Sequence, residues 1–298
     1  MNTAEIAIAL PVPDLFPEVR RRRGVAGYII RHPTIAGGGA ILMAVFLMAL
    51  LAPYLGTVDP TALAPVRRTR PPSAEYWFGT DMLGRDIYSR VIYGARVSLV
   101  VGFAVASIAS VIGLAIGLVS GFVRWADAVL MRVMDGLMSI PPILLAVALM
   151  ALTRGSVGNV ITAITVAEIP RVSRLVRGVV LSLREQPYVD AAVAAGTRTP
   201  VILWRHILPN TLAPMTVQAT YICASAMIVE AILSFIGAGT PPIIPSWGNI
   251  MAEGRALWQV KPFLVFFPAA FLSITVLAVN LLGDGLRDAL DPRMAKRL

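Results

Sequence analysis

Residues 97–123 read VSLVVGFAVASIASVIGLAIGLVSGFV and contain no charged residue. A helix of about 20 apolar residues crosses the hydrocarbon core of a bilayer, so this stretch predicts a transmembrane helix. Gly113, Gly117 and Gly121 recur along it at every fourth position. That spacing places the three glycines on one face, which predicts that a second helix packs closely against them.

Five further apolar segments accompany this one in a chain that is 57% hydrophobic and only 14% charged. They cover residues 34–55, 136–153, 157–169, 212–236 and 263–282. The segment 157–169 is too short to cross a bilayer, so we expect its helix to continue past Pro170 and to carry the arginines beyond it to an aqueous face. The pattern predicts an all-α polytopic membrane protein with six transmembrane helices.

Prolines and polar residues inside these segments predict a kink and candidate functional positions. Pro141 and Pro142 remove backbone donors, which predicts a kink in segment 136–153. Glu230 and Asn280 are polar groups within apolar runs. Such groups are candidates for the path of a transported solute, and the alternative that they only tie helices together stays open.

The basic residues lie between the spans, and their distribution predicts the orientation of the chain. An even number of spans puts both ends of the chain on one side of the membrane. If that side is the cytoplasm, most of the 26 Lys and Arg residues fall in cytoplasmic segments, as the positive-inside rule requires. The net charge of +9 therefore needs no nucleic acid as a partner.

Motifs for nucleotide binding and catalysis are absent from the sequence. Neither Lys261 nor Lys296 stands in Gly-Lys-Ser or Gly-Lys-Thr, so there is no P-loop for ATP. His32 and His206 lie far apart, and Cys223 is the single cysteine, which argues against a zinc site and an internal disulfide. We therefore expect a chain that is not an enzyme and holds no metal or cofactor, in which Cys223 packs as a small hydrophobe and His206 has a packing role.

A loop of small residues separates segments 157–169 and 212–236. Its first part, residues 188–196, reads YVDAAVAAG, follows Pro187 and ends in a glycine suited to a left-handed helix cap. It predicts a short helix outside the bilayer. A second turn is expected to begin with Thr199 as its cap and to stop at residues 208–210. Composition alone leaves open a simple interfacial helix.

The same loop resembles the EAA loop of ABC importer permeases, whose pattern is Glu-Ala-Ala, three residues, Gly, nine residues, Ile, one residue, Leu-Pro. The matching residues in this sequence are Asp190, Ala191, Ala192, Gly196, Leu208 and Pro209. Aspartate replaces the usual glutamate, and His206 stands at the isoleucine position. The resemblance implies that residues 186–210 couple the chain to an ATPase subunit, with Asp190 available to pair with a basic group.

Three further segments resemble the dipeptide and oligopeptide (peptide/nickel) permease family, and within it the C-type subunit. They are FGTD and GRD within 78–86, LSFIGAG and WG within 233–248, and GDGLR and LDPR within 283–293. The resemblance implies the type I ABC importer permease fold. Its expected parts are a cytoplasmic tail at 1–33, a first transmembrane helix at 34–55, an extracytoplasmic segment at 56–95, a permease domain at 96–285 and a cytoplasmic tail at 286–298.

The resemblance further implies a function and a set of partners. A homologous permease would form the translocation path with this chain, two cytoplasmic ABC ATPases would bind ATP and Mg, and an extracytoplasmic solute-binding protein would deliver the solute. The chain would lie in the bacterial plasma (inner) membrane and carry di- or oligopeptides. Nickel or another small solute is the alternative within the family, and an ion-coupled secondary transporter is the alternative from a different class.

The outer segments carry two further expectations. The charged residues between 78 and 96 predict a local salt-bridged structure against the homologous permease, with a gate as the alternative. Trp247 and Trp258 are candidates for contact with the binding protein or for anchoring at the membrane interface.

Overall fold

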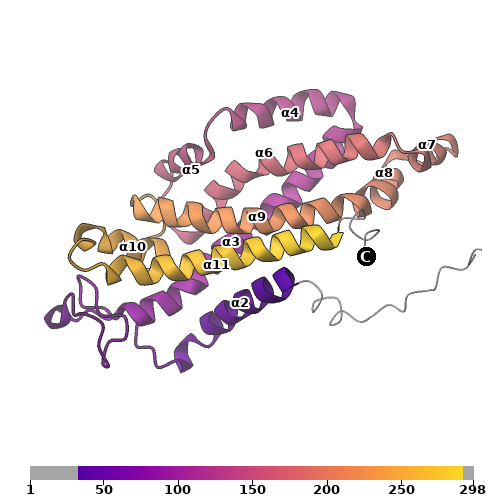
Figure 1. Ribbon diagram of the computed structural model, residues 1–298. Helices are drawn as coiled ribbons and strands as arrows, with labels where there is room; N and C mark the ends of the chain where they lie inside the picture. Colours follow the sequence, from indigo (N-terminus) through magenta and orange to yellow (C-terminus); the bar gives the residue numbers. More distant parts are fainter. Residues whose placement is uncertain (1–32, 291–298) are drawn as a thin grey trace, which may run out of the picture.

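The computed structural model describes residues 33–290, and this part of the chain is built from helices (Figure 1). The long helices are α2 (Pro33–Leu50), α3 (Ile87–Phe122), α6 (Val157–Arg184), α9 (Leu208–Phe235) and α11 (Phe263–Leu290). The shorter ones are α4 (Arg124–Met138), α5 (Pro142–Ala151), α7 (Pro187–Ala194), α8 (Thr199–Ile202) and α10 (Trp247–Gly254). The all-α prediction is confirmed for the described residues. The expected tails at 1–33 and 286–298 lie mostly outside them.

Four helices in residues 33–290 are long and apolar enough to cross a membrane: α2, α3, α11 and the continuous helix Thr199–Phe235. The pair α4–α5 is a fifth candidate if the two bent helices form one span. The remaining expected span is α6, which continues past Pro170 to Arg184 as predicted. Because α6 carries Glu168, Arg171 and Arg174 along its length, its composition alone does not identify it as a span.

The segment predicted as the third span is divided at the two prolines 141–142 into α4 and α5, which meet at an angle of 86°. The predicted kink is therefore present, but the predicted start at 136 is wrong, because α4 already begins at Arg124. Charged residues interrupt the apolar pattern of α4, and two of them pair with arginines of α6. Asp127 accepts hydrogen bonds of 2.5 and 2.6 Å from Arg177, and an exposed pair joins Asp135 to Arg174 at 2.6 Å.

The predicted small-residue face of α3 packs against α6. A Cβ atom added at Gly117 would lie 2.5 Å from the Cβ atom of Val176. Gly113 and Gly121 repeat this close approach with the valines one turn away on α6, and all three valines are fully buried. Since real Cβ atoms keep larger separations, only glycine lets the two helices approach this closely.

We expect Gly117→Ala to lower the stability of the protein by about 1–3 kcal/mol, because the added methyl group overpacks the contact with Val176. Gly178→Ala is the matched control on α6, since no heavy atom lies within 4 Å of a Cβ atom there. It is expected to be neutral or slightly stabilising. Thermal unfolding of the purified protein tests this, and equal melting temperatures for the two variants would contradict the packing.

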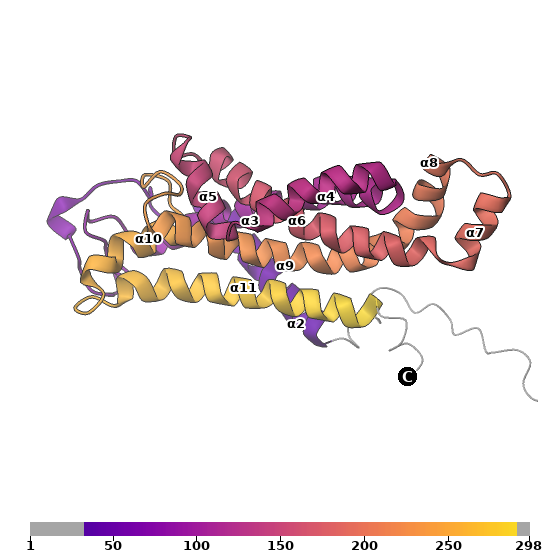
Figure 2. The same cartoon turned by 90° about the horizontal axis from the view of Figure 1, so that it is seen from above.

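The two ends of the helix bundle differ in structure (Figure 1, Figure 2). At one end, α7 and α8 project beyond the long helices. At the other end lie α10 and the segment between α2 and α3. The beginning of α2 and the end of α11 lie at the same end as α7 and α8. The first and last described residues therefore share one end with the projecting helices.

Two predicted boundaries near the outer segment differ from the structure. The first helix was expected to reach residue 55 but ends at Leu50, followed by a 3-10 turn at Ala52–Tyr54. The second helix was expected to begin at residue 97, but α3 begins at Ile87; the expected end of the outer segment at residue 95 stays a prediction. Asp86 caps this helix by accepting a 2.8 Å hydrogen bond from the backbone N–H of Ser89.

Candidate functional site

The projecting end of the bundle forms a helical elbow, which comprises residues 186–210. Helix α7 begins with Pro187 at its first position, and Gly196 follows its last turn with a φ of +75°. The N–H of Thr197 donates to the carbonyl oxygen of Ala192 at 3.0 Å, and the N–H of Gly196 donates to that of Val193 at 2.9 Å. This pair of bonds is a Schellman cap, so the glycine terminates α7 as predicted.

The second arm of the elbow differs from its prediction. Thr199 lies inside α8 and makes no capping hydrogen bond, because Arg198 occupies the capping position. The helix also does not stop at residues 208–210. A π-helical turn, Leu203–Ile207, joins α8 directly to α9, so the elbow and the span form one continuous helix. Movement of the elbow would therefore be transmitted directly into α9.

The residues that match the EAA pattern lie on or near the surface of the elbow. Asp190, Ala191, Gly196 and Pro209 are exposed, while Ala192, His206 and Leu208 are half-buried. The His206 ring lies 6.2 Å from the Tyr188 ring, so it packs between the two arms. No side-chain hydrogen bond or ion pair joins Asp190 to another described residue. The elbow thus exposes small residues and a carboxylate that has no side-chain partner in the described part of the chain.

Glu230 and Asn280, the two candidates for the solute path, lie in different surroundings. Glu230 is fully buried on α9, where its Oε1 atom accepts a 2.8 Å hydrogen bond from Ser234. Asn280 is half-buried on α11, and no hydrogen bond joins its side chain to Glu230 among the described residues. The structure therefore does not bring the two together, and Glu230 could meet a solute only if the surrounding residues moved.

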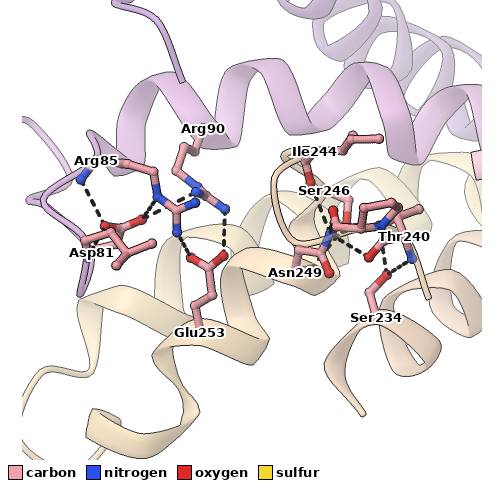
Figure 3. A network of polar contacts seen from close by, with 11 residues as sticks. Asp81, Arg85, Arg90, Ser234, Thr240, Ile244, Ser246, Asn249 and Glu253 are labelled. Carbon is pink, nitrogen blue, oxygen red and sulfur yellow. Dashed lines mark hydrogen bonds and ion pairs between the residues drawn. The ribbon is translucent and has the colours of Figure 1, made fainter. Parts of the chain in front are cut away.

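Through Ser234, Glu230 is connected to a buried polar network that holds the loop after α9. Figure 3 shows Ser234, Thr240 and Asn249 of this network. The hydroxyl of Ser234 lies 3.2 Å from that of Thr240. Asn249 of α10 is the centre of the network, because its Nδ2 atom lies within 3.2 Å of the carbonyl oxygens of Thr240, Pro241 and Ile244. The two N–H donors of this amide are shared among several acceptors of one turn, which fixes α10 to that turn.

A cluster of four charged side chains lies beside this network and joins α10 to the start of α3 (Figure 3). Asp81 accepts a 2.6 Å bond from Nε of Arg85, whose Nη2 donates to Glu253. Arg90 is fully buried and pairs with Glu253 at 3.1 Å and with Asp81 at 3.5 Å. Burial raises the pKa of the Glu253 carboxyl, and the two guanidinium groups oppose that rise.

The structure bears on both expectations about the outer segments. The charges between 78 and 96 do form a salt-bridged structure, and among the described residues Glu253 of α10 is one of its partners; contact with a homologous permease stays a prediction. Trp247 is fully buried, and its Nε1 donates to the backbone carbonyl oxygen of Val91 at 3.0 Å, so it cannot anchor the chain at a membrane interface. Trp258 remains 60% exposed.

One buried acidic residue in the membrane part was missed in the sequence. Glu168 of α6 is 2% exposed, with Arg171 at 3.2 Å and the Ser225 hydroxyl of α9 at 3.3 Å. It ties α6 to α9. Its position inside the apolar run 157–169 was the signal that could have identified it, since charged groups within spans usually have a specific partner.

These features define a class of protein: an integral membrane permease whose elbow provides a contact surface at one end of a helix bundle. Residues 90–296 match the family described as binding-protein-dependent transport system inner membrane component, and the chain belongs to this family. It is a multi-pass membrane subunit of a transport system, as the resemblance in the sequence implied. Membership in this family favours that reading over an ion-coupled secondary transporter.

Relatives from several bacteria cover nearly the whole chain. The probable peptide ABC transporter permease protein y4tQ of Sinorhizobium fredii is 54% identical over 90% of this chain and 91% of its own. The dipeptide transport system permease protein DppC of Alkalihalophilus pseudofirmus is 42% identical over 95% and 94%. The oligopeptide transport system permease protein OppC of Bacillus subtilis is 38% identical over 87% and 85%.

A solved structure supports the fold independently. Inward-facing MetNI, a methionine ABC transporter, contains a chain that superposes with a TM-score of 0.58 at 22% identity, covering 68% of this chain and 96% of that one. The type I importer permease fold expected from the sequence is thereby supported.

Proposed function

We propose that this chain is the permease subunit of an ABC importer for di- or oligopeptides. It forms the translocation path together with a homologous permease, and two cytoplasmic ATPase subunits drive transport. The relatives named above are peptide, dipeptide and oligopeptide permeases that align over most of their length, which supports peptides as the solute. An extracytoplasmic binding protein would deliver the peptide to the end of the bundle that carries α10.

The observation that carries this proposal is the elbow. It projects from the bundle and continues without a break into α9, and its Asp190 carboxylate has no side-chain partner within residues 33–290. A partner that pushes on the elbow would therefore move a long helix as a rigid body. We assign the coupling role to the residues of the EAA pattern: Asp190, Ala191, Ala192, Gly196, His206, Leu208 and Pro209.

The proposed orientation follows from the same assignment. If the elbow contacts cytoplasmic ATPases, the first and last described residues, which lie at that end, also face the cytoplasm. ATP and Mg would be bound by the partner subunits, and this chain would contribute no catalytic group. The contact of Glu230 and Asn280 with solute stays a proposal, and for Glu230 it requires the loop after α9 to open.

Purification of the tagged chain from its native membrane tests the proposal. We expect two ABC ATPase subunits and a homologous permease to copurify, and we expect the reconstituted complex with its binding protein to import a labelled di- or tripeptide only with ATP. Uptake of nickel or another small solute in place of peptide would leave the ATPase coupling intact but overturn the assigned solute. Transport by the isolated chain would overturn the whole proposal.

A further inference from the structure

A groove lies on the surface of the bundle between α2 and α3, two helices that are long and apolar enough to cross a membrane. It has a volume of about 640 Å³ and is lined by Phe46, Ala49, Leu50, Leu99, Val100 and Phe103, with Arg96 as its one charged residue. We call it the α2–α3 groove. Most of its lining side chains remain well exposed, so no element among the described residues covers it. The volume falls within the range of small-molecule binding sites.

Arg96 stands at the border between the polar and apolar parts of α3. The uncharged run 97–123 begins directly after it, and the buried charge cluster precedes it. Its guanidinium group lies 5.0 Å from the centre of the Tyr93 ring. Arginine and tyrosine side by side are typical of the level where lipid headgroups meet hydrocarbon. Arg96 therefore marks the headgroup level at the outer end of the groove.

Hydrogen bonds to α2 hold the guanidinium group of Arg96 in place but do not use all of its N–H donors. Nε donates to the carbonyl oxygen of Ala49 at 2.6 Å, and Nη2 donates to that of Leu50 at 3.2 Å. Both acceptors belong to the last turn of α2. Arginine has five N–H donors, so further donors remain for an oxygen-rich anion. A phosphate is well matched to this group because it accepts charge-assisted hydrogen bonds from a guanidinium.

The groove continues towards the middle of the membrane. A second hollow of about 400 Å³ shares Phe103 with it and extends along α3 as far as Val111. At 1.5 Å per residue, the distance along α3 from Arg96 to Phe103 is about 10 Å, and to Val111 about 22 Å. One leaflet contributes about half of a 30 Å hydrocarbon core. The two hollows thus span the depth of one leaflet.

We propose that the α2–α3 groove binds a glycerophospholipid of the outer leaflet, with its phosphate at Arg96 and one acyl chain along the apolar lining. Arg96, the one charged residue that lines the groove, and the uncharged lining below it complement the two parts of such a lipid. The lipid would join the end of α2 to α3 and cover apolar surface on both. This site does not depend on which solute the transporter carries.

The test is native mass spectrometry of the whole transporter complex in mild detergent, titrated with phosphatidylglycerol. This lipid has no ammonium group that would compete with Arg96 for the phosphate. We expect wild type to retain one tightly bound phospholipid. We expect Arg96→Gln to weaken binding of phosphatidylglycerol at least about tenfold, as loss of a charge-assisted hydrogen bond predicts.

Arg255→Gln is the matched control for the charge. Arg255 also donates to the last carbonyl of a long helix, that of Phe235 at 2.9 Å, and also lies over an aromatic ring, but it borders a separate pocket of only about 160 Å³. We expect it to leave lipid binding unchanged. Equal losses in Arg96→Gln and Arg255→Gln would overturn the site, because they would indicate a general effect of surface charge.

Val100→Trp tests the apolar part of the site, because Val100 is exposed within the groove and a larger side chain would fill it. Val119→Trp is its control on the exposed side of α3 outside both hollows. We expect only the first substitution to release the lipid. If wild type retains no phospholipid, or if Val100→Trp releases the homologous permease while the lipid count stays the same, the groove is not a lipid site.

Discussion

Gly196→Trp is expected to reduce ATP-driven uptake to background while the assembled complex continues to hydrolyse ATP without control by solute. Gly196 has a φ of +75°, and no heavy atom lies within 4 Å of a Cβ atom placed there. The indole would therefore project from the elbow into the space that the ATPase is proposed to occupy. Uptake by proteoliposomes and ATP hydrolysis with and without loaded binding protein measure the two effects.

Two control variants separate steric bulk from backbone strain. Gly56 also has a positive φ, +69°, and equally open surroundings, but it lies in the segment after α2 at the opposite end of the bundle. Gly56→Trp should therefore cause comparable strain and leave ATPase coupling intact. Gly196→Asn keeps a residue that tolerates the left-handed region and should retain most of the uptake. Solute-stimulated uptake at the wild-type rate in Gly196→Trp would refute the docking role of the elbow.

The elbow was largely predictable because its determinants are local. Pro187 at a helix start and Gly196 after its last turn act through their own backbone geometry, so the sequence pattern places α7 within a residue or two. The π-helical turn, Leu203–Ile207, was not predictable in this way. The Leu-Pro pair suggested a stop, but the chain passes from α8 through the π-helical turn into α9, and Pro209 lies inside this continuous helix.

The charged parts of the long helices were predicted less well, because their partners are distant in sequence. Arg90 interrupts the apolar pattern at the start of α3, so the sequence suggested a later helix start. In the structure it is neutralised by Glu253, 163 residues away. The charges of α4 likewise interrupt its apolar pattern, so most of this helix was not predicted. In the structure, Asp127 and Asp135 pair with arginines of α6. A run of apolar residues predicts a helix that lies in lipid. It does not predict a helix whose charged residues pair with other helices, because those pairs depend on the tertiary fold.

Glu230 shows how far the candidate solute path could be predicted from the sequence. A carboxylate inside an apolar run correctly indicated a residue with a specific environment. That environment is created by the loop after α9, which folds back so that Ser234, Thr240 and Asn249 form one network. No local pattern distinguishes this arrangement from a residue on a solute path, because both require a polar group within a span.

The second large effect, a loss of stability, is expected at the cluster of Asp81, Arg85, Arg90 and Glu253. Glu253→Gln should destabilise the folded protein by about 3 kcal/mol or more, because breaking one side of a buried ion pair leaves an uncompensated charge. Asp81 would then be the single carboxylate facing both Arg85 and Arg90. The melting temperature of the purified complex, followed by tryptophan fluorescence, measures the loss.

Asp135→Asn is the matched control, because the pair Asp135–Arg174 has the same chemistry but is more than half exposed at both side chains. Exposed pairs contribute about 0–1 kcal/mol, so this variant should change the melting temperature little. If Glu253→Gln and Asp135→Asn shift it equally, the cluster does not hold α10 to α3.

A double variant tests whether charge balance or the ion pair itself is required. Arg90→Met with Glu253→Met removes one charge of each sign and leaves the Asp81–Arg85 pair at 2.6 Å intact. Because burial of an ion pair carries a large desolvation cost, an apolar replacement of similar volume can be nearly neutral. We expect the double variant to be more stable than Glu253→Gln alone. The cluster would then act by determining which surfaces of α3 and α10 contact each other. Balanced charge at this contact, and not the ion pair itself, would be what α10 requires to stay packed against α3.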